Sequence, residues 1–138
     1  MKDILITAGP FRLEARLERA DAPATCRAFE ALLPWTSQFV HVRWSGEGIW
    51  IPLGESKFDF TYENHTSHPA PGQFIFYPGG ISETEILLAY GGVSFASKMG
   101  QLAGNHFLTV TAGQDHLKAL GNHVLWKGAT DVSFSRLG

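Results

Sequence analysis

The chain has 138 residues, 44% of them hydrophobic and 17% charged, and its formal net charge is −2 at pH 7. This length suits one domain whose core needs no disulfide or metal for stability, so we expect residues 1–138 to form a single domain. The near-neutral charge and the lack of any Lys/Arg run argue against nucleic acid and anionic membranes as partners. The N-terminus lacks a signal-peptide core, and the longest apolar run is too short to span a bilayer, which predicts a cytoplasmic protein.

The N-terminal part of the chain contains a predicted β-hairpin followed by a helix. Ile4–Thr7 is a short apolar run, and Phe11–Leu17 alternates apolar with charged residues, which is the pattern of a half-buried strand. Ala22–Leu33 has apolar residues at helical spacing, with a proline in its first turn and Pro34 directly after it. We therefore expect the principal α-helix over these residues.

Beyond this helix, apolar residues return to the two-residue period of strands. Gly- and Pro-rich turns separate the predicted strands, which are Phe39–Trp44, Ile49–Ile51, Phe58–Tyr62, Gln73–Tyr77, Glu83–Tyr90, Phe107–Thr111 and Val132–Leu137. A short helical turn is expected at Leu117–Leu120. Many short strands predict a sandwich or a barrel, and a closed barrel best removes exposed strand edges. The predicted fold class is therefore mostly β, a closed β-barrel with one principal α-helix.

The segment Ser82–Glu85, with the sequence SETE, offers two carboxylates two residues apart. In a strand, Glu83 and Glu85 lie on one face with their Cα atoms about 7 Å apart. In a partly enclosed site each carboxylate raises the pKa of the other, so that one can act as a general acid near neutral pH. In a helix, Ser82 and Glu85 instead form a capping box, and the helix must end at the following glycine pair. We favour the strand.

The segment Gly100–Phe107 contains Asn105 and His106 directly before an apolar strand. We expect these two side chains at a barrel mouth, where a histidine exchanges protons near neutral pH. The alternative is structural, with Asn105 capping a turn and His106 buried and hydrogen-bonded. Lys98, set among apolar residues, is either a carboxylate-binding group or a solvated surface charge. If the barrel brings both segments to one mouth, Lys98 lies between them.

Three further residues carry groups suited to small anionic substrates. Arg43, on the same predicted strand face as His41, has a planar fork for bidentate carboxylate binding, although it can equally be a solvated charge. Tyr77 is either a phenolic hydrogen-bond donor or a core aromatic residue. Glu63 begins a polar, proline-rich loop and is a further candidate for substrate binding. The six histidines form no recognised zinc motif, so no metal is predicted.

Four runs of the sequence carry a family resemblance: RWSGEGIWIPLG (Arg43–Gly54), ENHTSHPAPGQFIFYPGG (Glu63–Gly80), SETEILLAYG and FASKMGQLAGNHF. They resemble a bacterial family of unknown function with a cyclophilin-like fold, and the similarity extends over nearly the whole chain. The resemblance implies a cyclophilin-like barrel. It does not imply prolyl isomerase activity, because the Phe/Arg/Gln-rich active-site motifs of true cyclophilins are absent from this sequence.

This family is in turn similar to cucumopine synthase, which condenses L-histidine with 2-oxoglutarate in a cofactor-free Pictet–Spengler reaction. The resemblance implies an enzyme without a cofactor that needs cations for carboxylates, an acid for imine formation and a base for the ring proton. We expect catalytic roles for Glu83, Glu85, His106 and Tyr77. We expect substrate-binding roles for Arg43, Lys98, Asn105 and Glu63.

The expected partners are small molecules, either an amino acid or a keto acid, and the sparse surface charge favours a homo-oligomer. The alternative function is a non-catalytic binding module for a small carboxylate or a peptide at the same barrel mouth. Hydrolysis or isomerisation of a cyclic amide would use the same carboxylates, histidine and lysine. The residues alone therefore leave the reaction open.

Overall fold

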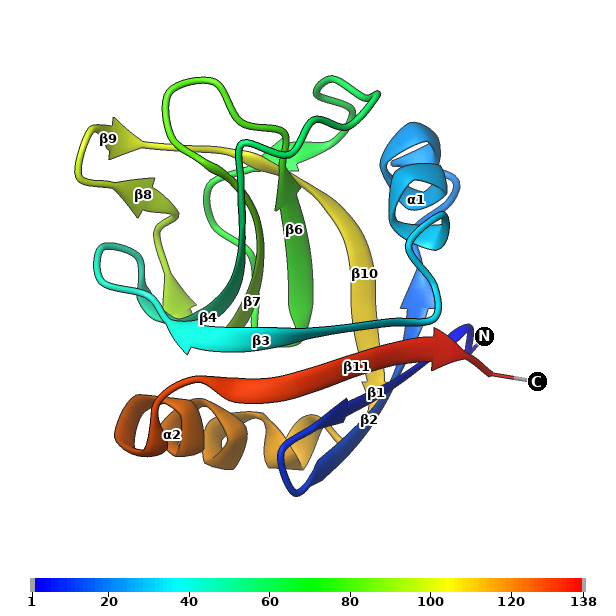
Figure 1. Cartoon of the computed structure of the whole chain (residues 1–138), viewed down its shortest axis with the longest axis vertical. Helices are drawn as coiled ribbons and strands as arrows, with labels where there is room; N and C mark the ends of the chain where they lie inside the picture. Colours follow the sequence, from blue (N-terminus) through cyan, green and yellow to red (C-terminus); the bar gives the residue numbers. More distant parts are fainter. Residues whose placement is uncertain (1, 138) are drawn as a thin grey trace.

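The computed structural model describes residues 2–137, and its centre is a closed antiparallel β-barrel (Figure 1). The strands follow one another around the barrel in the order β2, β1, β11, β3, β4, β7, β6 and β10, and β10 pairs with β2 to close it. Their bounds are β1 (Ile4–Ala8), β2 (Phe11–Leu17), β3 (Trp35–His41), β4 (Gly46–Gly54), β6 (Gln73–Tyr77), β7 (Thr84–Val93), β10 (Gly104–Ala112) and β11 (Thr130–Arg136). The predicted fold class, a mostly-β closed barrel, is confirmed.

Short strands and helical segments complete the fold. Their bounds are α1 (Pro23–Glu30), β5 (His65–Thr66), β8 (Ala96–Ser97), β9 (Gly100–Gln101), the 3-10 turn η1 (Gln114–His116) and α2 (Leu117–Lys127). β5 pairs with the start of β10, and β8 and β9 form a separate hairpin. Figure 1 shows α1 and α2 on opposite sides of β3 and β11. No helix within residues 2–137 is long and apolar enough to cross a membrane.

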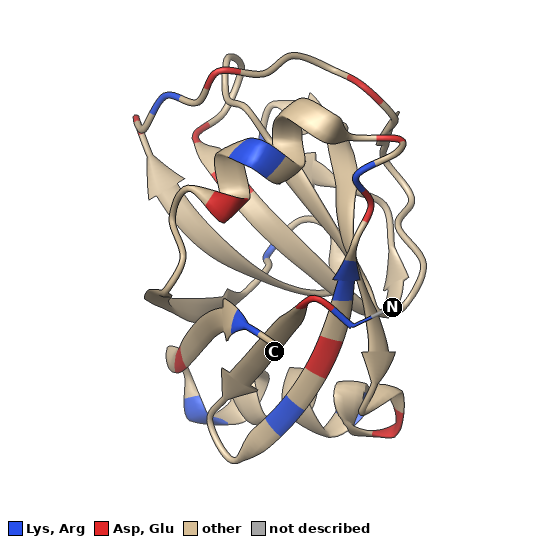
Figure 2. Ribbon diagram, turned by 90° about the vertical axis from the view of Figure 1, so that its right-hand side faces the viewer, with Lys and Arg blue, Asp and Glu red and all other residues tan. Residues whose placement is uncertain are grey.

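The barrel encloses an apolar core because its strands alternate inward apolar with outward polar side chains. In β2, for example, Leu13, Ala15 and Leu17 are buried. The intervening charged residues point outward and alternate in sign along the strand (Figure 2). This strand therefore has the half-buried character that its sequence predicts.

Strand β7 is buried on both faces, and this sets the position of the candidate site. Ile86 and Leu88 belong to the barrel core, whereas Leu87 and Ala89 point outward into a second apolar cluster. Val93, at the end of β7, belongs to this cluster, and the chain between β7 and β10, including the β8–β9 hairpin, covers it and contributes Phe95 and Leu102. Glu85 shares the outward face of β7 with Leu87, so it is held beneath this outer layer.

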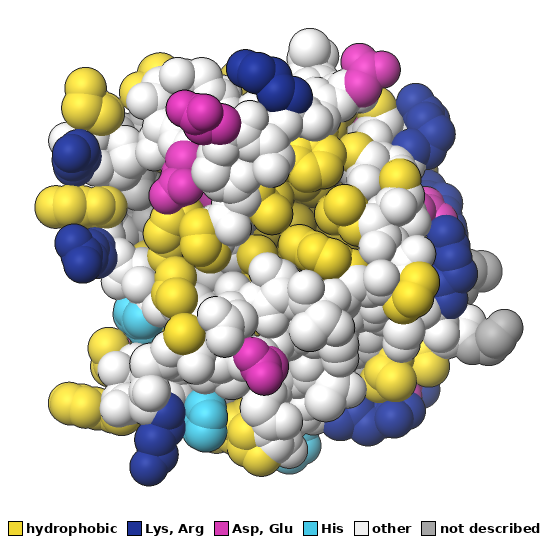
Figure 3. Space-filling view, in the orientation of Figure 1, with side chains coloured by type: hydrophobic (Ala, Val, Ile, Leu, Met, Phe, Trp, Pro, Cys, Tyr) yellow, Lys and Arg dark blue, Asp and Glu magenta, His cyan; other side chains and the backbone are white. Residues whose placement is uncertain are grey.

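Strands β3 and β4 pair over a short stretch. Their register joins Val40 to Trp50 and His41 to Ile49, and the Val42 amide donates to the Gly48 carbonyl at 3.2 Å, which continues the pairing toward the turn. On the other side of these pairs the strands diverge (Figure 1). Figure 3 shows apolar atoms in the hollow that opens beside the diverging strands. The paired end brings Val40 and Trp50 together on the outer face of the barrel, at the edge of the candidate site.

The helices differ from the prediction in extent. A helix is present within Ala22–Leu33, but α1 ends at Glu30, and the chain continues in turns up to Pro34. The longer helix is α2, where the sequence predicts only a helical turn at Leu117–Leu120. Gly121, a poor helix former, stands in the middle of α2 and weakens its helical signal in the sequence.

The strand predicted at Phe58–Tyr62 is wrong, because this segment is irregular. The rings of Phe58 and Phe60 pack edge-on against Phe76, with ring centroids 5.0 and 4.9 Å apart. The alternation of apolar residues here reports burial against the core. An irregular segment can satisfy that burial without joining a strand ladder.

Replacing Gly121 by alanine is expected to destabilise the protein, although alanine normally favours a helix by about 1 kcal/mol over glycine. A Cβ at this position would collide with the ring of Tyr90, which packs against α2 from β7. The helix or the ring must move, and overpacking of this kind costs about 1–3 kcal/mol. Urea denaturation should therefore show a lower free energy of unfolding for Gly121→Ala. Asn122→Ala, at an exposed position of the same helix, is the control, and equal stability of the two variants would contradict the prediction.

Candidate active site

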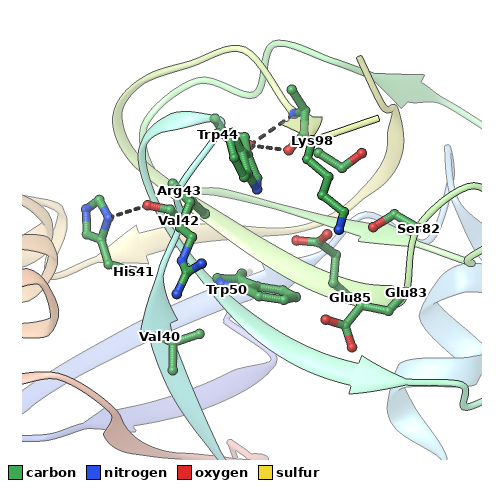
Figure 4. Close-up of a pocket in the computed structure, with 13 residues that line it drawn as sticks. Val40, His41, Val42, Arg43, Trp44, Trp50, Ser82, Glu83, Glu85 and Lys98 are labelled. Carbon is green, nitrogen blue, oxygen red and sulfur yellow. Dashed lines mark hydrogen bonds between the residues drawn. The ribbon is translucent and has the colours of Figure 1, made fainter. Parts of the chain in front are cut away.

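A cavity of about 490 Å³ lies outside the barrel, between the turn that follows β3 and the β8–β9 hairpin (Figure 4). This volume is within the range of small-molecule sites in proteins. Four residues predicted to be functional line the cavity, namely Arg43, Glu83, Glu85 and Lys98. Within residues 2–137, no three His, Cys, Asp or Glu side chains gather in a way that could hold a metal ion.

Glu85 is the most deeply buried charged residue of this cavity. It is 7% exposed, and it lies on β7, which confirms the strand from Thr84 onward in place of the capping box. Burial raises the pKa of Glu85 to about 8, with a further contribution from the negative charge of Glu83. None of the ion pairs formed within residues 2–137 includes Glu85. At neutral pH the side chain is therefore mostly a neutral carboxylic acid that can donate a proton.

Two cations line the cavity from separate elements. Arg43 lies in the turn after β3, which ends at His41, so the strand predicted over Phe39–Trp44 is too long. His41 also lines the cavity, and its ring nitrogens lie 2.9 Å from the Val42 carbonyl and 2.7 Å from the Tyr90 hydroxyl (Figure 4). Because β3 ends at His41, Arg43 lies outside the strand, and the strand face predicted for the two residues is not formed. Lys98 occupies the turn of the β8–β9 hairpin and extends toward the two glutamates. Both cations are exposed and form no ion pair within residues 2–137, so both are free to bind carboxylates.

Two tryptophans give the cavity apolar walls. Trp50 is half-buried on β4, and Trp44 is 57% exposed in the turn after β3. Their indole faces offer apolar contact to a planar ligand. Sequence reasoning did not assign them to the site, because a tryptophan in a strand pattern equally predicts a core residue.

Ser45 joins the two walls that carry the cations. It is 5% exposed, and its hydroxyl donates to the carbonyl of Ala96 at 3.1 Å and accepts from the amide of Ala96 at 3.0 Å. The carbonyl of Ser45 also accepts the amide of Ser94 at 2.9 Å. These bonds tie the turn that carries Arg43 to the hairpin that carries Lys98, and they thereby hold the two backbone segments together.

Ser45→Ala is expected to loosen the β8–β9 hairpin. The variant loses both side-chain bonds to Ala96, so the free energy of unfolding should fall by about 1–2 kcal/mol. Amide hydrogen exchange in residues 95–102, followed by mass spectrometry, should become faster. Ser94→Ala, whose hydroxyl makes only a 3.5 Å contact with His68, is the matched control. Unchanged exchange in the hairpin of Ser45→Ala would show that Ser45 does not hold it.

Tyr77 supports the cavity from behind and does not line it. Its side chain is buried in the second apolar cluster, opposite Glu85 in the β6–β7 register. Its hydroxyl accepts hydrogen bonds from the amides of Ile81 and Ser82, at 3.0 and 3.2 Å. Those bonds shape the loop that carries Ser82 and Glu83 to the rim. The phenol therefore positions the loop, and the structure shows no contact between it and the cavity.

Asn105, which is fully buried, and Glu63, which is half-buried, form a hydrogen-bond network beside α1, away from the cavity. The side-chain carbonyl of Asn105 accepts the amide of Glu63 at 2.9 Å, and its NH₂ group donates to Thr25 Oγ1 and to the Thr61 carbonyl, both at 2.8 Å. Glu63 accepts from the amides of Ala24 and Thr25 and from the Thr25 hydroxyl. Burial opposes ionisation of Glu63, but these hydrogen bonds outweigh it and lower the pKa. The prediction that Asn105 lies at a barrel mouth is therefore wrong. Glu63, a candidate for substrate binding, instead accepts the first amides of α1, and Asn105 holds it there.

His106 lies on the opposite side of β10 from Asn105, because successive strand residues alternate. Its Nε2 is 2.7 Å from the hydroxyl of Thr109, which donates to Glu18 at 2.5 Å. Burial lowers the pKa of His106, although the charge of Glu18 acts in the opposite direction. The histidine belongs to the seam between β10 and β2, so the prediction that it shares a mouth with the SETE carboxylates is wrong.

Comparison with known proteins identifies a sequence family and a solved structure of similar fold. Residues 4–136 match the family described as "Protein of unknown function (DUF3830)". Among solved structures, that of McbB in complex with tryptophan shares the fold, with a TM-score of 0.72 and 18% sequence identity. The match covers 98% of this chain and 45% of McbB, so the chain spans less than half the length of that protein. No curated protein matches the chain.

Proposed function

The chain belongs to the DUF3830 family, whose description assigns no reaction, and we propose that it is a cofactor-independent acid–base enzyme that condenses an amino acid with a keto acid. One observation carries the proposal. A buried and protonated carboxyl group, that of Glu85, faces a small-molecule cavity that also holds the free cations Arg43 and Lys98. A neutral acid suits imine formation, and the cations suit carboxylate substrates.

The specific reaction that we propose is the Pictet–Spengler condensation of L-histidine with 2-oxoglutarate, as in cucumopine synthase. The resemblance of the sequence motifs supports it, and so does the fold shared with McbB, whose structure contains tryptophan, an amino acid with an aromatic ring. The cavity matches the two carboxylates of 2-oxoglutarate with two cations, Arg43 and Lys98. Trp44 and Trp50 supply apolar walls for a planar imine.

In the first step, the amine nitrogen of the amino acid attacks the keto carbon, and the resulting carbinolamine loses water to give an iminium ion. The attacking amine must be neutral, and Glu83, exposed at the rim, accepts its proton. Glu85 donates a proton to the departing hydroxyl, which leaves as water. Glu85 is then a carboxylate, and the positive charge of the iminium ion stabilises it.

In the second step, the imidazole carbon attacks the iminium carbon and closes a six-membered ring. The attacking carbon must then lose its proton to restore the aromatic ring, and the Glu85 carboxylate accepts that proton. This returns Glu85 to its protonated form, so one side chain serves first as the acid and then as the base. Glu83 releases the proton of the original ammonium group to solvent.

Mass spectrometry of the protein incubated with L-histidine and 2-oxoglutarate tests the proposal. The expected product has the summed mass of the substrates less one water, and it should form faster than in buffer. Other amino acids with aromatic rings, each paired with other keto acids, separate the choice of substrates from the reaction class. If no pair gives a water-loss adduct above the buffer rate, the enzyme proposal fails. Thermal stabilisation by these ligands without turnover would instead identify a binding module.

A further inference from the structure

A second cavity, of about 590 Å³, adjoins the first. It lies between residues 54–57, at the end of β4, and residues 78–84, which lead into β7. Ser82 and Glu83 line both cavities, so the two spaces meet at this pair of residues. Figure 4 places the pair on the side of the first cavity that is away from Arg43.

The two cavities have opposite charge balances. The first contains the cations Arg43 and Lys98 beside Glu83 and the buried Glu85, and burial raises the pKa of Glu85 to about 8. The second contains the carboxylates Glu55 and Glu83 and a single cation, Lys57. None of these side chains forms an ion pair within residues 2–137. The first cavity therefore favours an anion, and the second favours a ligand with an amine.

Glu83 lies where the two cavities join. A Cβ on Gly54, which lines the second cavity, would be 4.0 Å from Oε2 of Glu83. The carboxylate is therefore close to the backbone at the end of β4 while it also faces the first cavity. A proton acceptor in this position can serve a group that enters from the second cavity and reacts in the first.

We propose that the two cavities bind the two reactants separately, with the dicarboxylate keto acid in the first and the amino acid in the second. The inference rests on the proposed function and assigns a substrate class to each cavity. The ammonium group lies between Glu55 and Glu83, and the carboxylate of the amino acid lies at Lys57. The amine thus reaches the keto carbon at the junction, where Glu83 takes its proton.

Two probes that cannot react with each other test this arrangement by charge alone. Glutarate is a dicarboxylate without a keto group, and histamine is an amine with an imidazole ring. Isothermal titration calorimetry should show that Lys98→Ala weakens glutarate binding about fivefold, the scale of one exposed ion pair, and leaves histamine binding unchanged. Glu55→Gln should weaken histamine binding to a similar extent and leave glutarate binding unchanged. Asp115→Asn and Lys118→Ala, at exposed positions of η1 and α2, control for net charge, and an unchanged unfolding midpoint shows that each variant is folded.

The inference is overturned if Lys98→Ala weakens the binding of both probes, if Glu55→Gln leaves histamine binding unchanged, or if the wild-type protein binds neither probe. Failure of the proposed function has a different signature. If L-histidine and 2-oxoglutarate give no adduct while the probes respond as expected, the separate binding of the two probes is supported and the proposed reaction is rejected. If an adduct forms but the two variants do not affect the two probes differently, the proposed reaction is supported and the two-cavity arrangement is rejected.

Discussion

Replacing Glu85 by glutamine is expected to lower kcat for the condensation by about 10²–10⁴-fold. Glutamine keeps the shape of the side chain but has no acidic proton, so it can neither protonate the departing hydroxyl nor accept the ring proton. KM should change little, because Arg43 and Lys98 remain to hold the carboxylates. Initial rates of adduct formation, with one substrate varied and the other saturating, give both constants.

The pH dependence of kcat strengthens this test. Because the pKa of Glu85 is about 8, the acid form is lost above that pH, and the wild-type rate should fall on the alkaline side. The residual activity of Glu85→Gln should lack this alkaline limb. Asp115→Asn, a charge removal on the exposed surface of η1, should keep both the rate and the limb. A glutamine variant with the wild-type rate would show that Glu85 is not the acid.

The same substitution should also change how stability depends on pH. The pKa of Glu85 is about 8 in the folded protein against an ordinary value of 4.5, so the unfolded chain ionises this group at a lower pH. Between the two values the native state binds more protons, and stability falls as the pH rises. Relative to the glutamine variant, the wild-type protein should lose on the order of 4 kcal/mol over this range. Urea denaturation near pH 5 and near pH 8 measures the difference between the two proteins.

The strand face on which Glu85 lies, relative to its neighbours in β7, could be predicted from the sequence, because strand alternation is a local property. Glu85 and Leu87 are two residues apart, so any strand through SETEILLAYG places them on one side. The depth of burial could not be predicted in the same way. It depends on the covering layer that contains Phe95 and Leu102, and the path of that chain over β7 is a tertiary feature.

The predicted role of the Asn-His pair failed because its partners are distant in sequence. Asn105 bonds to Thr25, 80 residues earlier in the chain. His106 contacts Thr109, and Thr109 bonds to Glu18, 91 residues away. A polar residue before an apolar strand predicts either a mouth or a buried network, and only the long-range pairing of strands decides between the two. The alternation along β10 also shows that the two side chains could not have faced one site.

Asn105→Ala is expected to lower the free energy of unfolding by about 3–5 kcal/mol. The variant removes the partners of the Glu63 amide and the Thr61 carbonyl, while Thr25 keeps its bond to Glu63. Asn105 is fully buried, and each buried group that loses its hydrogen-bond partner costs about 1–3 kcal/mol. Urea denaturation measures the change. Asn64→Ala, which loses one 2.8 Å bond to the His106 carbonyl, is the matched control and should cost about 1 kcal/mol.

Ligand binding distinguishes this structural role from the substrate contact that the sequence predicts for Asn105. The residues that form the first cavity are held by β3, β4, β7 and the β8–β9 hairpin, whereas Asn105 joins β10 to α1. Folded Asn105→Ala should therefore bind 2-oxoglutarate with the wild-type affinity, as measured by calorimetry well below its unfolding midpoint. The opposite result would be a large loss of affinity for 2-oxoglutarate in an Asn105→Ala protein whose stability is within about 1 kcal/mol of wild type. That result would show that Asn105 contacts the ligand, because a residue that contacts only the ligand leaves the unliganded fold intact.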